Sequence, residues 1–62
     1  MLATRLRAIR TERGLTQEQL ASHARVAVST LRKIESERVI EPGYFTMLSL
    51  ATALGIDLRD LV

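Results

Sequence analysis

The sequence predicts a compact all-α fold, and two observations support this prediction. First, Leu and Ala are abundant in the 47% of the chain that is apolar, whereas β-branched residues are scattered and only Tyr44 and Phe45 are aromatic; such a composition favours helices. Second, apolar residues recur three and four positions apart, which is the period of a helix with one buried face. A chain of 62 residues has room for one domain at most, so we expect residues 1–62 to form a single domain of marginal stability.

The first helix is expected over about residues 2–13. Leu2, Leu6 and Ile9 follow one another at i, i+4 and i+7 and would form its buried stripe. Gly14 then supplies the left-handed residue with which helices commonly end.

The second helix is expected to begin after Thr16 and to end near Ala24. The Thr16 hydroxyl can accept a hydrogen bond from the backbone N–H of Gln19, and the Gln19 side chain can reach back to Thr16. This reciprocal arrangement is a capping box, which is a fairly specific signal for a helix start. The buried face of the helix would consist of Leu20, Ala21 and Ala24.

The third helix is expected from about Val28 to Ser36, with Leu31 and Ile34 pointing inward. Ala27 stands at its N-cap position and offers no side-chain oxygen to the first N–H groups, which costs about 0.5–2 kcal/mol relative to Ser or Thr. The second and third helices are too short to be stable alone, so they depend on the others for packing.

The fourth helix is expected over about residues 44–54, because Pro42 and Gly43 prevent a helix from running through and Gly55 closes the pattern. Its predicted buried positions are Tyr44, Met47, Leu48, Ala51 and Leu54.

A fifth, very short helix would then be capped by Asp57. Leu58, Leu61 and Val62 would be its apolar contacts or, if exposed on the monomer, a surface through which the chain forms a dimer.

Positive charge is concentrated in the first part of the chain. Residues 1–38 hold eight basic side chains against four acidic ones, a balance of +4, whereas residues 39–62 have a balance of −2. One basic half makes a polyanion a candidate partner. Ordinary solvated helix surface explains the same charges equally well, so charge alone does not decide.

Several functional classes are disfavoured by the residues that are missing. The chain has no Cys and one His, His23, which we expect on the surface, so we predict no disulfide, no metal site, no cofactor and no enzyme activity. No apolar run approaches the length needed to span a membrane. Arginines interrupt the first ten residues, which therefore lack a signal-peptide core. We expect a cytoplasmic protein, which also fits the lack of Cys.

Three sequence segments of the chain resemble a known family. They are RGLTQEQLA at 13–21, STLRKIE at 29–35 and LATALGIDLRDLV at 50–62, in the order and spacing of the Cro/repressor-type helix-turn-helix domains. This family is also called the xenobiotic-response-element or lambda-repressor-like type. The resemblance implies a five-helix domain that binds double-stranded DNA as a homodimer. It also implies that helix two lies across the phosphate backbone and helix three enters the major groove.

Carried onto this chain, the resemblance places Thr16 and Gln17 against a DNA phosphate at the start of helix two. Thr16 is also a cap, and both roles are compatible. The base-facing positions on helix three would be Val28, Ser29, Arg32 and Lys33. Alternatively, Val28 belongs to the core, because it precedes Leu31 by three residues. For Arg32 and Lys33 the alternative is a solvated helix surface.

The resemblance also assigns residues around the end of helix three. Ser36 and Arg38 stand where family members touch phosphates. Arg10 and Glu35 match an ion pair that ties helix one to the end of the recognition helix. That pair belongs to the scaffold, although Arg10 is also a candidate for a phosphate contact.

The chain departs from the family mainly at the turn between helices two and three. Arg25 replaces the usual turn glycine, and a left-handed residue other than glycine costs on the order of 1 kcal/mol. Ala24 is smaller than the Leu-like residue common there, and Glu37 would repel phosphate. We favour the hypothesis that Arg25 forms the turn normally and adds a phosphate contact.

Two functions therefore compete. The favoured one is a small transcriptional regulator, acting as a repressor in a bacterium or phage, that reads double-stranded DNA with helix three. The rival is a protein-interaction module that has kept the helix-turn-helix core but acts through a partner protein.

Overall fold

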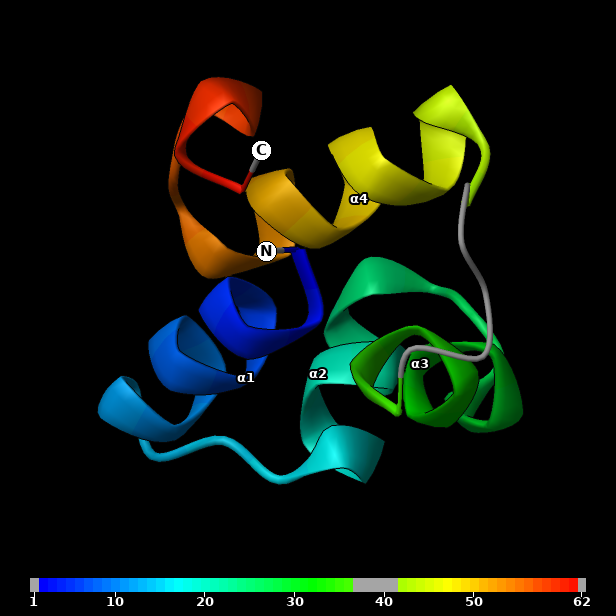
Figure 1. The fold of residues 1–62 in the computed structure, drawn as a ribbon. Helices are drawn as coiled ribbons and strands as arrows, with labels where there is room; N and C mark the ends of the chain where they lie inside the picture. The colour runs from blue at the N-terminus through cyan, green and yellow to red at the C-terminus, as the bar shows by residue number, and fades with distance from the viewer. Residues whose placement is uncertain (1, 37–41, 62) are drawn as a thin grey trace.

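The computed structural model describes residues 2–36 and 42–61. Over these residues the chain forms four α-helices: α1 (Leu2–Glu12), α2 (Gln17–Ala24), α3 (Val28–Glu35) and α4 (Tyr44–Leu54), followed by a 3-10 turn at Leu58–Asp60. The helix α3 packs against both α1 and α2, and α4 packs against α2 (Figure 1). No helix in the described part of the chain is long and apolar enough to cross a membrane.

The core collects apolar side chains from every element. Leu6 of α1, Leu20 of α2, Leu31 of α3 and Leu50 of α4 are completely buried, and so is Leu61 after the 3-10 turn. Since each helix is short, this shared core rather than intrinsic helix propensity holds the elements together.

The helix caps agree with the sequence at Thr16, Ala27 and Asp57. Thr16 and Gln19 form the predicted capping box, with Gln19 N donating to Thr16 Oγ1 at 3.0 Å and Thr16 N donating to Gln19 Oε1 at 2.9 Å. Ala27 makes no side-chain cap bond, as expected. The fifth helix, however, is only a three-residue 3-10 turn, because the chain turns at Leu61 directly after it.

Asp57 caps this 3-10 turn. Its Oδ1 accepts a hydrogen bond from Arg59 N at 2.9 Å, and its Oδ2 lies 3.2 Å from Arg59 Nη2. The hydrogen bonds from Arg59 lower the pKa of the Asp57 carboxyl below its ordinary value. The side chain of Arg59 has the larger effect and its backbone N–H the smaller one. The cap therefore stays ionised to a lower pH than an ordinary aspartate.

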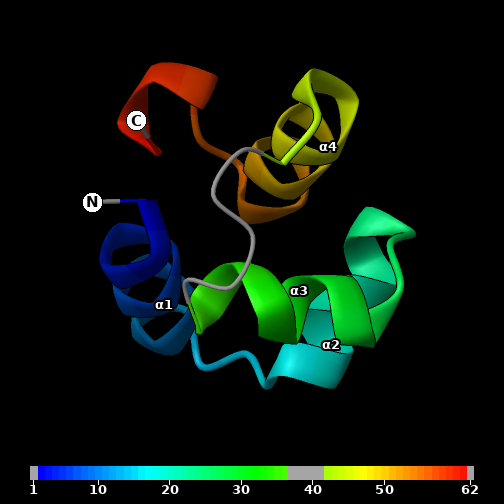
Figure 2. The same ribbon diagram turned by 45° about the vertical axis from the view of Figure 1, so that its right-hand side comes forward.

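The 3-10 turn also contacts α1, so the two ends of the described chain lie close together. Arg5 Nη1 donates to Asp60 O at 3.3 Å, and the first turn of α1 lies beside the C-terminal turn in both ribbon views (Figures 1 and 2). Leu61 is buried at this junction. The expectation that Leu61 is exposed for dimerisation is therefore wrong, while Val62 lies outside the described residues.

The prediction for the buried face of α4 was partly wrong. Met47, Ala51 and Leu54 are buried as expected, but Tyr44 and Leu48 are exposed and Leu50 takes their place in the core. Eight of the eleven residues of α4 are apolar or aromatic (YFTMLSLATAL), so more than one face satisfies the helical period. The buried face is selected by contacts with α2 and with the 3-10 turn. The helical period of α4 carries no information about these contacts.

Candidate nucleic-acid interface

Helix α3 has two chemically different faces. Leu31, Ile34 and Glu35 are buried on one side, whereas Ser29, Arg32 and Lys33 are exposed on the other. The i, i+4 spacing of Ser29 and Lys33 places them one above the other on the helix surface. The helix therefore presents hydrogen-bond donors and positive charge to solvent while its opposite face fixes it to the core.

Val28, at the start of α3, lies between these faces. It is half-buried and packs against the core, so it contributes to the scaffold while part of its side chain remains accessible. Both roles considered for Val28 are compatible with this position.

The end of α3 is held by a buried carboxylate. Glu35 is 3% exposed, and its Oε2 lies 2.7 Å from Arg10 Nε while its Oε1 accepts from Arg10 Nη2 at 3.0 Å. Arg10, which is 12% exposed, also donates to Leu15 O at 2.7 Å. Arg7 Nη2 donates to the backbone oxygen of Glu35 at 2.6 Å. Two arginines of α1 thus bind the last turn of α3.

The start of α2 is joined to the same carboxylate. Gln17 Nε2 donates to Glu35 Oε1 at 3.0 Å, so the side chain of Gln17 points toward the junction with α3. Thr16 is exposed and acts as the cap. The amide of Gln17 thus has one hydrogen bond inside the protein, and the start of α2 keeps a fixed position relative to α3.

Side chains from the three helices line a shallow hollow of about 400 Å³. It is lined by Arg7, Arg10, Gln17, Arg32, Glu35 and Ser36. Three residues predicted from sequence to contact DNA, Gln17, Arg32 and Ser36, therefore meet here with the predicted ion pair. The Ser36 hydroxyl donates to Lys33 O at 3.1 Å. Because Glu35 is already bound by Arg10, the hollow as a whole is cationic and polar.

Arg25 lies elsewhere, at the turn between α2 and α3. It lines a different hollow with residues of α4. Its backbone is left-handed, with φ 58° and ψ 40°, and Val26 N and Arg25 N donate to Ala21 O and Ser22 O at 3.0 and 3.2 Å. This is the Schellman pattern. Gly14 and Gly55 occupy the same left-handed position at the ends of α1 and α4, so Arg25 forms the turn that glycine forms at the other two helix ends.

We expect Arg25→Gly to raise the melting temperature. Removing the left-handed strain of a side chain is worth about 1 kcal/mol, which corresponds to roughly 4–8 °C for a domain of this size. Arg25→Ala is the matched control, because it removes the charge but keeps Cβ and hence the strain. Thermal unfolding followed by circular dichroism would measure the melting temperature of both variants. If Arg25→Gly melted no higher than Arg25→Ala, the left-handed backbone of Arg25 would not be strained.

Arg38, and Glu37 with its expected repulsion of phosphate, lie outside the described residues. His23 is exposed, and no group of metal ligands occurs among residues 2–36 and 42–61.

Sequence reasoning missed two residues at this surface, Arg7 and Glu18. Arg7 precedes Arg10 by one helical turn, a spacing that could have indicated a shared face. Glu18 forms an ion pair with Arg32 of α3, and no spacing within one helix could have indicated that contact.

Comparison with known proteins gives consistent matches. A family model described as helix-turn-helix matches residues 6–61. The chain is 45% identical over 58 residues to the immunity repressor protein of Bacillus phage phi105, covering 94% of this chain and 40% of that protein. It is 39% identical over 61 residues to the HTH-type transcriptional regulator DdrOP3 of Deinococcus deserti, covering 98% of this chain and 46% of that protein. The chain thus spans less than half the length of either relative.

A solved structure shares the whole arrangement. The crystal structure of the restriction-modification controller protein C.AhdI from Aeromonas hydrophila matches with a TM-score of 0.94 at 36% sequence identity. The match covers 98% of this chain and 91% of that chain.

Proposed function

The chain belongs to the helix-turn-helix family, and on that premise we propose that it binds double-stranded DNA sequence-specifically as part of a transcriptional regulator, most simply a repressor. The observation that carries the proposal is the two-faced α3, which buries Leu31, Ile34 and Glu35 and exposes Ser29, Arg32 and Lys33. We further propose that the 62 residues act as one DNA-binding domain in the cytoplasm of a bacterium or an infected cell.

In this proposal α3 enters the major groove in a lambda-repressor-like manner. Lys33 and Arg32 donate to guanine O6 and N7, and Ser29 bonds to a base edge or a phosphate. The accessible part of Val28 contacts a thymine methyl group. These contacts depend on the fixed position of α3, which Glu35 and the two arginines of α1 provide.

Phosphate contacts surround the groove contacts. The start of α2, at Thr16 and Gln17, offers backbone N–H groups and the positive end of the helix dipole to a phosphate. Ser36, Arg25 and Arg38 are the further candidates. The polar hollow lined by Arg7 and Ser36 lies between α1 and α3, and we propose that it faces the DNA backbone.

The salt dependence of binding tests this proposal against the protein-interaction alternative. Binding to duplex DNA through several phosphates should weaken steeply with salt, with a slope of about −0.9 in log–log form for each phosphate neutralised. Fluorescence anisotropy with a labelled duplex at increasing potassium chloride measures that slope. Duplex binding that is absent at low salt would reject DNA binding and leave a protein partner.

Lys33→Ala is expected to weaken and broaden DNA binding without unfolding the chain. Lys33 is exposed, so its loss should change the free energy of unfolding by no more than about 0.5 kcal/mol. A base contact of this kind is worth about 1–3 kcal/mol of discrimination. Competition binding with a preferred and a single-base-substituted duplex measures the change. A large loss of stability with unchanged selectivity would instead place Lys33 in the scaffold.

The same protein is proposed to act as a homodimer, and the exposed aromatic side chains at the start of α4 suit that role. Phe45 and Tyr44 of α4 are 79% and 61% exposed, and their rings meet edge to face with centroids 5.4 Å apart. Exposed aromatic side chains beside one another commonly mark an interaction surface.

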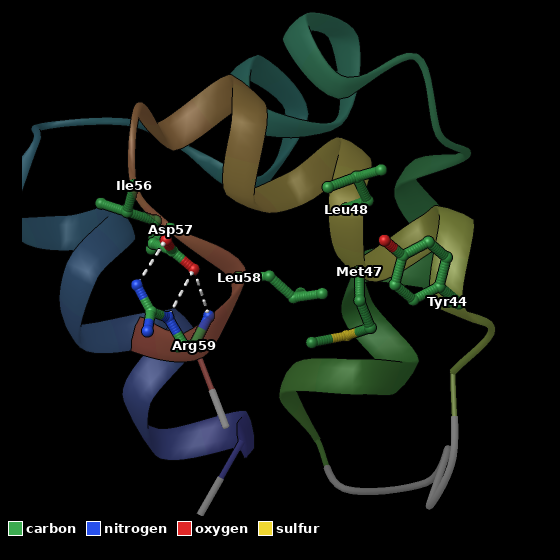
Figure 3. A pocket seen from close by; sticks show the side chains of 7 residues that line it. All are labelled: Tyr44, Met47, Leu48, Ile56, Asp57, Leu58 and Arg59. Atoms are coloured by element: carbon green, nitrogen blue, oxygen red, sulfur yellow. Dashed lines mark hydrogen bonds and ion pairs between the residues drawn. The ribbon is translucent and has the colours of Figure 1, made fainter.

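Next to these rings lies an apolar groove of about 660 Å³, formed where α4 meets the C-terminal turn. Figure 3 shows Leu58 reaching toward Met47, with Leu48 and Tyr44 on the α4 side and the Asp57–Arg59 pair at the edge. The chain thus carries both a projecting ring and an apolar groove. A two-fold axis can place each copy's Phe45 near the groove of the other, which is the self-complementarity that a symmetric dimer requires.

A further inference from the structure

The exposed face of the helix-turn-helix unit contains an ion pair between its two helices. Arg32 Nη2 of α3 lies 2.9 Å from Glu18 Oε2 of α2. The side chains of Arg32 and Glu18 are 53% and 66% exposed. The pair therefore lies on the surface, where α2 and α3 meet, and it engages a residue proposed to read DNA.

The groups around Arg32 explain why Glu18 is its partner. Arg32 shares the polar hollow with Arg7, Arg10 and Glu35. The Glu35 carboxylate is already bound by Arg10 and by the amide of Gln17. Glu18 is thus the carboxylate that draws the guanidinium of Arg32 toward α2 and away from the two arginines of α1.

We propose that Glu18 is a positioning residue that aims Arg32 at one base pair of the operator; this inference rests on the proposed DNA-binding function. A guanidinium has five N–H donors in a rigid fork. When one edge is bound by Glu18, another edge remains for guanine O6 and N7. Fixing the side chain before binding also reduces the rotamer freedom that DNA contact would otherwise remove.

The negative charge of Glu18 should also increase the selectivity for sequence in a second way. A carboxylate on the DNA-facing surface repels phosphates, so it weakens contacts that do not depend on sequence. An exposed ion pair contributes little to folding stability. The consequence of losing Glu18 should therefore appear in the choice of base rather than in the melting temperature.

The test is a set of parallel selections from one pool of random duplex DNA. The unmodified chain, Arg32→Ala, Glu18→Ala and Glu18→Gln are each used to enrich sequences. Glu12→Ala serves as the control, because it removes another exposed carboxylate, at the end of α1. Arg32→Ala identifies the base position that Arg32 reads. We expect Glu18→Ala to lower the preference at that same position by roughly threefold to tenfold, with all other positions retained.

Glu18→Gln should keep most of the preference, because its amide oxygen still accepts a hydrogen bond from Arg32. Glu12→Ala should leave every position unchanged. A purely structural role would weaken all positions together and lower the melting temperature, which would overturn the proposal. If Glu18→Ala left the base preference unchanged at the position that Arg32 reads, the positioning role of Glu18 would be overturned too. The proposed DNA-binding function would then still stand. If the unmodified chain enriches no sequence, both proposals fail.

Discussion

Replacing Glu35 by Ala is expected to leave most of the protein unfolded at 25 °C. The substitution removes both carboxylate oxygens that bind Arg10, at 2.7 and 3.0 Å, and the acceptor of the Gln17 amide. Arg10 is only 12% exposed, so its charge would remain in a desolvated position with Leu15 O as its other acceptor. Breaking one side of such a buried pair costs about 3–5 kcal/mol, and a core of this size rarely supplies more than about 3–5 kcal/mol.

Urea unfolding followed by circular dichroism measures this effect, and two further variants make it specific. Glu12→Ala removes an exposed carboxylate and should change the free energy of unfolding by no more than about 0.5 kcal/mol. The double variant Arg10→Met, Glu35→Leu replaces both charges by apolar groups, which in other buried pairs is close to neutral. We expect it to recover much of the stability. If Glu35→Ala lowered the free energy of unfolding by less than about 1 kcal/mol, the Arg10–Glu35 pair would not be what holds α3 in place.

Replacing Phe45 by Glu is expected to convert the proposed homodimer into a folded monomer. Burying a Phe side chain is worth about 1.5–3 kcal/mol, and a symmetric interface contains two copies of it. The dimer dissociation constant should therefore rise by roughly a hundredfold or more. Glu in the first turn of α4 is compatible with the helix dipole, so the monomer should remain folded.

Sedimentation equilibrium over a range of protein concentrations measures the dissociation constant. Thr52→Glu is the matched control, because Thr52 is exposed on the same helix and lines the hollow beside Arg25 rather than the apolar groove. DNA binding should weaken along with dimerisation, since each half-site would be bound alone. A Phe45→Glu chain that still forms dimers would place the interface on another face.

The features that the sequence predicted well are those determined by neighbours in the chain. The capping box of Thr16 and Gln19 and the left-handed ends at Gly14 and Gly55 depend on a few consecutive residues. Arg25 is instructive, because the apolar spacings on both sides were enough to predict the turn despite the absence of glycine. Its φ is 58°, in the left-handed region that glycine adopts at the other two helix ends.

Features that depend on contacts between distant segments were predicted less well. Periodicity could not choose between the faces of α4, so Leu50 was missed and Leu48 was placed in the core. Leu61 is buried in the same core cluster as Leu6 of α1, which lies far from it in sequence. Glu18 and Arg32 are fourteen residues apart, and only the angle between α2 and α3 brings them together.

Selection from a random pool of duplex DNA with the purified protein tests whether α3 reads DNA sequence. Sequencing of the enriched pool would report both the preferred bases and their arrangement. We expect a roughly two-fold symmetric site whose half-sites lie about one helical turn of DNA apart, with binding that falls steeply as salt rises. A pool that shows no enrichment over several rounds, with only weak salt-sensitive binding, would contradict the claim that α3 reads DNA sequence.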